Sequence, residues 1–102
     1  MSALEAVLSE VIDGKIYIFF DGRLDTAKTF QIQSQIISLA DGAQHPLVFD
    51  LEKVDFVASA FLRLCIISAR TVGADRFFLV NLNPTVSRVF SIAGLDKHLQ
   101  IA

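Results

Sequence analysis

Hydrophobic and polar positions along the chain alternate between two kinds of segment, and the alternation predicts strands separated by helices. Short apolar runs with turn signals at their ends predict five strands, at residues 6–11, 15–20, 47–51, 76–80 and 98–101. Longer segments with helical spacing predict helices at 26–40, at 60–72 and from Asn83-Pro84 to Gly94. The expected order is β-β-α-β-α-β-α-β, so the fold class is α/β.

The connections predict a mixed sheet of about five strands with packed helices. Asp13-Gly14 is a hairpin signal between the first two strands, whereas helical crossovers imply parallel pairing for much of the rest. We expect Asp21-Gly22 to end the second strand and residues 54–58 to form a connecting segment. No linker or repeat divides the chain, so residues 1–102 are expected to form one domain.

For two of the helices the sequence predicts which face is apolar and which is polar. In the first, Asp25 stands where an N-cap belongs. Its apolar half comprises Phe30, Ile32, Ile36, Ile37, Leu39 and Ala40. The helix at 60–72 is apolar almost all round, and its polar stripe consists of Arg63 and Arg70.

Composition and charge narrow the function classes. Hydrophobic residues make up 53% of the 102, but no apolar run approaches the roughly 20 residues that span a bilayer. We expect no secretory signal at the first residues and, with Cys65 as the sole cysteine, a cytoplasmic location. The formal charge of −2, without a basic stripe, argues against nucleic acid as a partner.

Catalytic and metal-binding patterns are missing from the sequence. His45 and His98 lie far apart, with no cysteine or acid at metal-ligand spacing. Cys65 falls among apolar residues in a helix, which is typical of a core residue. Ser59 has no glycine elbow and no obvious base. We therefore expect no enzymatic activity, no metal and no cofactor.

Three segments together resemble the STAS domain, the fold of bacterial anti-sigma-factor antagonists. Residues 22–25, Gly-Arg-Leu-Asp, are similar to the family's Gly-x-Leu-Asp. Residues 51–62 resemble its strand, loop and Asp-Ser-Ser-Gly-Leu element, and residues 83–95 resemble its closing Pro-x-Val and Gly-Leu pattern. The resemblance covers nearly the whole chain in the family's order and spacing.

The resemblance implies a partner switch. In that family a serine at the start of the central helix is phosphorylated by a partner serine kinase, which is often itself an anti-sigma factor. The unmodified antagonist binds the kinase and frees the sigma factor, and a phosphatase reverses the modification. By position, the phosphorylatable residue here is Ser59.

Elementary chemistry at Ser59 allows two interpretations. Its hydroxyl could cap the helix that follows, which would contribute about 1 kcal/mol to stability. A phosphate in the same place would lie at the positive end of the helix dipole and would add about −1.5 to −2 charges to a binding surface.

Departures from the family pattern keep alternatives open. Ala58 stands in place of the Asp before the serine, Ala60 in place of the second Ser and Phe61 in place of the Gly. These changes favour a constitutive scaffold or interaction module without phospho-control. A sensor of a small molecule or nucleotide near Asp25 and Ser59 is a further alternative.

Residues around Ser59 are candidates for partner binding. Arg63, Ile67 and Arg70 share one stripe of the helix, which is either a solvated edge or a partner-binding ridge. Asp25 is either a helix cap alone or a neighbour of the modified serine. The predicted partner-binding set is Asp25, Ala58, Ala60, Phe61, Arg63, Ile67 and Arg70.

The strands at 16–20 and 77–80 are apolar on both faces. Helices on one side of the sheet would leave the other side apolar and exposed, and a homodimer or a second partner could then cover it. The alternative is that helices cover both faces.

Overall fold

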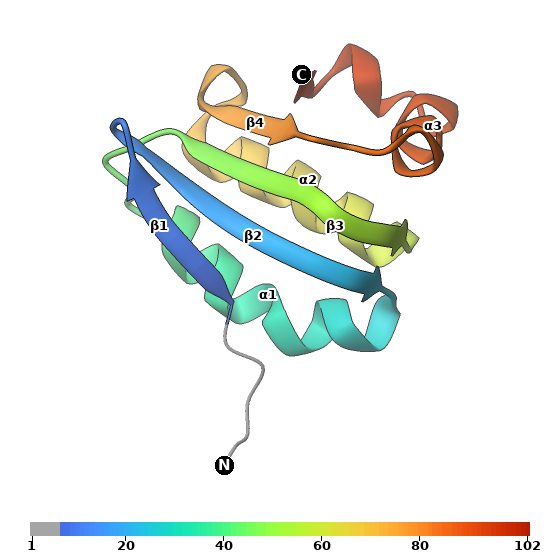
Figure 1. Cartoon of the computed structure of the whole chain (residues 1–102). Helices are drawn as coiled ribbons and strands as arrows, with labels where there is room; N and C mark the ends of the chain where they lie inside the picture. Colours follow the sequence, from blue (N-terminus) through green and yellow to red (C-terminus); the bar gives the residue numbers. More distant parts are fainter. Residues whose placement is uncertain (1–6) are drawn as a thin grey trace.

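The computed structural model describes residues 7–102 (Figure 1). Its strands are β1 Leu8–Ile12, β2 Lys15–Leu24, β3 Leu47–Val57, β4 Phe77–Val80 and β5 Gln100–Ile101. Its α-helices are α1 Thr26–Ala40, α2 Ser59–Val72 and α3 Pro84–Ile92. Two short 3-10 helices, η1 Ala74–Arg76 and η2 Leu95–Lys97, precede β4 and β5. None of the described helices is both long and apolar enough to cross a bilayer.

The strands form one mixed sheet in the order β1-β2-β3-β4-β5. β1 and β2 make an antiparallel hairpin, in which Leu8 pairs with Phe19 and Ile12 with Lys15. The pairs β2–β3, β3–β4 and β4–β5 are parallel. The predicted α/β class, element order and mixed sheet are therefore confirmed, although residue 6 of the first predicted strand lies outside the described residues.

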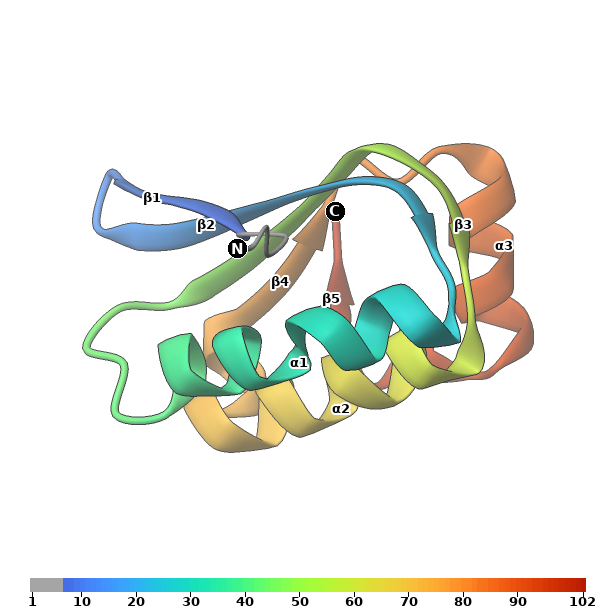
Figure 2. The same ribbon diagram turned by 90° about the horizontal axis from the view of Figure 1, so that it is seen from below.

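The two long helices lie side by side on one face of the sheet (Figure 2). α3 lies at the end where β3 finishes, and the Asn83 side chain ties it there by donating to the Val54 carbonyl oxygen at 2.9 Å. Parallel strands are joined by crossover connections, which here contain the helices. Each of these helices therefore starts at the edge of the sheet where the strand before it ends. That edge is where the candidate site lies.

Phenylalanine rings fill the space between the sheet and the helices. The Phe49 centroid lies 4.9 Å from that of Phe20 and 4.8 Å from that of Phe77, both with edge contacts. Phe61 of α2 packs on Phe20 at 5.2 Å. Such buried edge contacts add to the large apolar area that each ring removes from water.

Two central strands run further than their sequences predict. Asp21-Gly22 does not end β2, and residues 54–57 are the last part of β3 and not a connection. Asp21 pairs with Lys53 and Gly22 with Val54, and a register shift that adds a residue to β3 lies on each side of these two pairs. These bulges bend β3, and pairing with β3 continues past Asp21-Gly22 of β2, which alone are typical of a turn.

The predicted apolar face of α1 is wrong at one position. The Phe30 side chain is 61% exposed, whereas Thr29 beside it is fully buried. The buried residues Thr29, Ile32, Ile36 and Ala40 recur at three- and four-residue spacing, so the stripe that faces the sheet passes through the threonine.

The opposite face of the hairpin has no described helix over it (Figure 2). Leu8 is 67% exposed there, beside the half-buried Phe19 with which it pairs. The alternative that helices cover both faces is therefore wrong for this part of the sheet. A homodimer across the face stays a prediction.

Candidate functional site

The candidate site begins where β2 and β3 end next to each other. Leu24 and Val57, the last residues of the two strands, pair in register. The Ala58 amide donates to the Leu24 carbonyl oxygen at 2.9 Å, which continues the pairing by one residue. As a result, Asp25 and Ala58, which precede α1 and α2, stand together at this edge.

The start of α1 is capped by the side chain of Asp25. The Asp25 carboxylate accepts a hydrogen bond from the Lys28 amide at 2.9 Å. This bond satisfies one of the donors for which the first helical turn has no internal acceptor. The prediction that Asp25 is the N-cap is confirmed.

The start of α2 has a different construction. Ala58 is its N-cap, in extended conformation with φ −93° and ψ 167°, and supplies no side-chain hydrogen bond. Ser59 is the first helical residue, so the interpretation of its hydroxyl as the cap is wrong. Pairing with β2 holds Ala58 extended, and the helix can begin only after it.

The Ser59 side chain is exposed at this helix start. The Phe61 and Leu62 amides both donate to the Ala58 carbonyl oxygen, at 2.9 and 3.2 Å. The amides of Ser59 and Ala60 are therefore the donors without an acceptor inside the helix. An exposed hydroxyl beside two such donors is a place where an anionic group can be attached and stabilised.

Phe61 does not crowd the Ser59 hydroxyl. Its side chain is fully buried and contacts Phe20 and Phe49, with ring centroids 5.2 and 6.0 Å apart. The bulk that replaces the family's glycine therefore points into the core. In this structure the Phe61 ring anchors α2 and is not available to a partner.

The exposed side of α2 carries a continuous line of side chains, which we call the α2 stripe: Ser59, Arg63, Ile67 and Arg70. The spacings of four, four and three residues place them on one helix face. Ile67 is 37% exposed and is the large apolar side chain between the two arginines. The opposite side of α2 buries Phe61, Leu64, Cys65, Ser68, Ala69 and Val72.

An exposed pair of side chains near this edge, Arg23 and Phe56, was not predicted from the sequence. The Arg23 guanidinium lies 4.2 Å from the centroid of the Phe56 ring, which is 37% exposed. The two residues pair across β2 and β3, and Phe56 precedes the α2 N-cap by two positions. Recognising the pair requires the bulged register, because residues 54–58 alone read as a loop.

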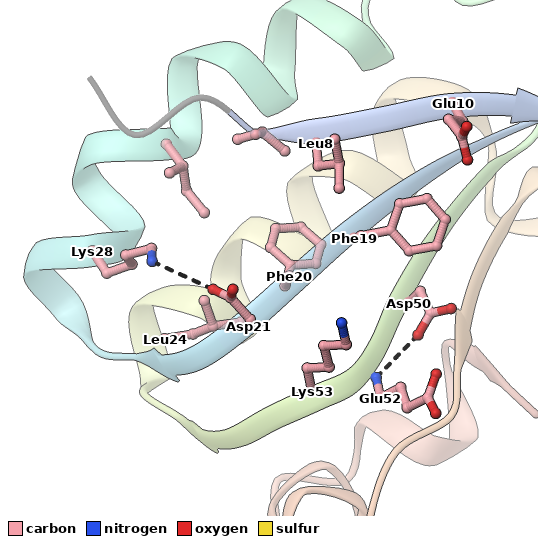
Figure 3. Close-up of a pocket in the computed structure, with 12 residues that line it drawn as sticks. Leu8, Glu10, Phe19, Phe20, Asp21, Leu24, Lys28, Asp50, Glu52 and Lys53 are labelled. Carbon is pink, nitrogen blue, oxygen red and sulfur yellow. Dashed lines mark hydrogen bonds and ion pairs between the residues drawn. The ribbon is translucent and has the colours of Figure 1, made fainter. Parts of the chain in front are cut away.

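A hollow of about 490 Å³ lies on the other side of β2, between the hairpin and α1 (Figure 3). Phe19, Phe20 and Leu24 line it together with acidic and basic side chains from β1, β2, β3 and α1. The Lys28 ammonium there lies 3.9 Å from an Asp21 carboxylate oxygen. Asp25 and Ser59 do not line this hollow, so it does not support a ligand sensor at those two residues.

Other chemically capable residues are not assembled into a site. Complete burial raises the pKa of the Cys65 thiol well above its usual value, which disfavours the reactive thiolate. Across residues 7–102, no three histidine, cysteine or acidic side chains come close enough to hold a metal ion.

Comparison with known proteins identifies the fold family. The family model of the STAS domain matches residues 6–102. The chain belongs to the STAS domain family. An STAS domain protein from Planctomyces limnophilus has the same fold, with a TM-score of 0.84 over 93% of this chain and 87% of its own, at 24% identity.

Relatives found in both comparisons carry the name anti-sigma-factor antagonist. One of them is BtrV of Bordetella bronchiseptica, whose name as an anti-sigma-factor antagonist is provisional. It is 28% identical to this chain over 93 residues, which are 89% of this chain and 80% of BtrV. The phosphorylated form of SpoIIAA, a cell-fate determinant of Bacillus, superposes with a TM-score of 0.69 at 26% identity, over 95% of this chain and 91% of that one. Membership in the STAS family thus agrees with the resemblance carried by residues 22–25, 51–62 and 83–95.

Proposed function

We propose that this chain is an anti-sigma-factor antagonist that binds a serine-kinase anti-sigma factor and is controlled by phosphorylation of Ser59. The observation that carries the proposal is the exposed Ser59 hydroxyl at the uncapped start of α2. The named relatives support the antagonist role, and the phosphorylated SpoIIAA structure supports phospho-control within the family.

The local structure can accept a phosphate without unfolding. The free amides of Ser59 and Ala60 and the helix dipole favour a negative group at this end of α2. Arg63 lies four residues further along the same face, within the spacing at which helical side chains form ion pairs. A phosphoserine could therefore accept hydrogen bonds from both the helix end and the Arg63 guanidinium.

The same phosphate would change the surface that a partner meets. The unmodified α2 stripe carries the two positive charges of Arg63 and Arg70. A phosphate of about −1.5 to −2 charges would offset almost all of this positive charge. The phosphate oxygens would also need hydrogen-bond donors or a positive charge beside them. A kinase surface fitted to a neutral hydroxyl and two arginines would lose charge complementarity.

We place the partner contacts along the α2 stripe and at the strand ends. Ile67 would supply the apolar contact, flanked by Arg63 and Arg70. Ala58 and Ala60 are the sequence neighbours of Ser59, and Asp25 follows Leu24, whose carbonyl oxygen accepts from the Ala58 amide. Phe61 acts through its burial, which fixes the helix start. A phosphatase would then restore the binding-competent state.

Mass spectrometric mapping tests the covalent step. The chain is incubated with ATP and the serine-kinase anti-sigma factors of the source organism, and we expect a single phosphate on Ser59. Ser59→Ala should abolish the modification, whereas Ser91→Ala, at an exposed serine of α3, should not. A phosphate on another residue, or none, would favour the constitutive scaffold.

A further inference from the structure

A second hollow, of about 590 Å³, lies on the side of the molecule where α2 ends. Its apolar lining comes from Ile66 and Ala69 of α2, Ala74 of η1, and Leu95 and Leu99 in and after η2. The hollow falls within the range of roughly 300–1,000 Å³ that is usual for small-molecule sites.

Two nitrogen-bearing side chains, Arg70 and His98, line the same hollow, and no acidic residue does. The Arg70 side chain is exposed, and among residues 7–102 no carboxylate forms an ion pair with it. The guanidinium is always charged and can donate two parallel hydrogen bonds to a carboxylate. Apolar walls beside an unpaired arginine are complementary to an apolar molecule with one anionic end.

We infer that the hollow between α2 and η2 binds an alkyl monocarboxylate, with its chain over Ile66, Leu95 and Leu99 and its carboxylate at Arg70. The hydrocarbon would cover apolar surface that is otherwise in contact with water. The carboxylate would accept charge-assisted hydrogen bonds from Arg70, and His98 lines the same hollow.

The position of Arg70 links this site to the α2 stripe. The residue lines the hollow and also forms the far end of the stripe, eleven positions after Ser59. A bound carboxylate would occupy the guanidinium and compete with an acidic group of a protein partner. The competition with a protein partner rests on the proposed function. The binding of the carboxylate to the isolated chain does not rest on it.

Titration of the ¹⁵N-labelled chain, followed by amide chemical shifts, tests the inference. The probes are octanoate, octan-1-ol and octylammonium, which share a chain length and differ in the end group. We expect saturable changes with octanoate at Ile66, Ala69, Leu95 and Leu99, and binding of the other two that is weaker by about tenfold or more.

Variants locate the carboxylate. Arg70→Gln should weaken octanoate binding about tenfold. Arg88→Gln, at an exposed arginine of α3 that does not line the hollow, should leave it unchanged. The inference is overturned if octanoate gives no saturable change, if octan-1-ol binds as well, or if the changes map to the open face of the β1–β2 hairpin.

Discussion

The starts of α1 and α2 lie side by side at one edge of the sheet, yet they are stabilised by different means. Asp25 closes α1 with a side-chain hydrogen bond, and Asn83 closes α3 in the same way, with its oxygen 2.8 Å from the Val86 amide. At α2 the N-cap is an alanine, and the start is fixed by strand pairing and by the buried Phe61 ring. The start of α2 therefore has no side-chain cap hydrogen bond, and the exposed Ser59 side chain lies after the cap position.

The largest expected effect comes from removing the packing that holds α2. Phe61→Ala should lower the free energy of unfolding by about 3–5 kcal/mol, because a fully buried ring leaves a cavity among Phe20 and Phe49. Urea unfolding followed by circular dichroism measures the change. A loss below about 1 kcal/mol would show that Phe61 does not anchor the helix.

Removing the cap of α1 should have a smaller effect. Asp25→Ala should cost about 1 kcal/mol, since the Lys28 amide loses its acceptor. Asp25→Asn is the matched control and should retain most of the stability, because asparagine caps as well as aspartate. Equal losses for both variants would mean that charge, not the capping hydrogen bond, is what matters.

Adding a cap to α2 should make the two helix starts alike. Ala58 already has the extended backbone of an N-cap residue, so Ala58→Ser should raise the free energy of unfolding by about 1 kcal/mol. Thermal and urea unfolding would both report the gain. No gain would indicate that the α2 amides already have an acceptor in solution.

The smallest effect is expected at the serine itself. Ser59→Ala should change stability by less than about 0.5 kcal/mol, because the side chain is exposed and lies after the cap position. A loss near 1 kcal/mol in urea unfolding would restore the interpretation of Ser59 as the cap.

Most of the fold could be predicted from the sequence, because hydrophobic periodicity indicates the helices and strands and capping residues indicate where the helices begin. The α1 bounds, the Asp25 cap and the Asn83-Pro84 helix start are examples. The last residues of β2 and β3 were not predicted as strand. They stay in the strands because they pair with each other across the sheet, which local composition does not show. Phe30 was placed in the core by its hydropathy, although the stripe that faces the sheet passes through Thr29.

The candidate site was predictable in position but not in construction. The resemblance placed Ser59 at the start of the central helix, which the structure confirms. That Ala58, and not Ser59, is the N-cap depends on the hydrogen bond from Ala58 to Leu24 of another strand. The Phe61 ring points inward and packs against Phe20 of β2 and Phe49 of β3, whereas the helix was expected to be apolar almost all round.

The most direct test of the account is the affinity of the chain for its serine-kinase anti-sigma factor, measured by calorimetry for the unmodified chain, Ser59→Asp and Ser91→Asp. A negative charge at the open start of α2 should weaken binding by about tenfold or more, and the same charge on α3 should leave it unchanged. Equal affinities for all three proteins would contradict the claim that Ser59 controls the interaction.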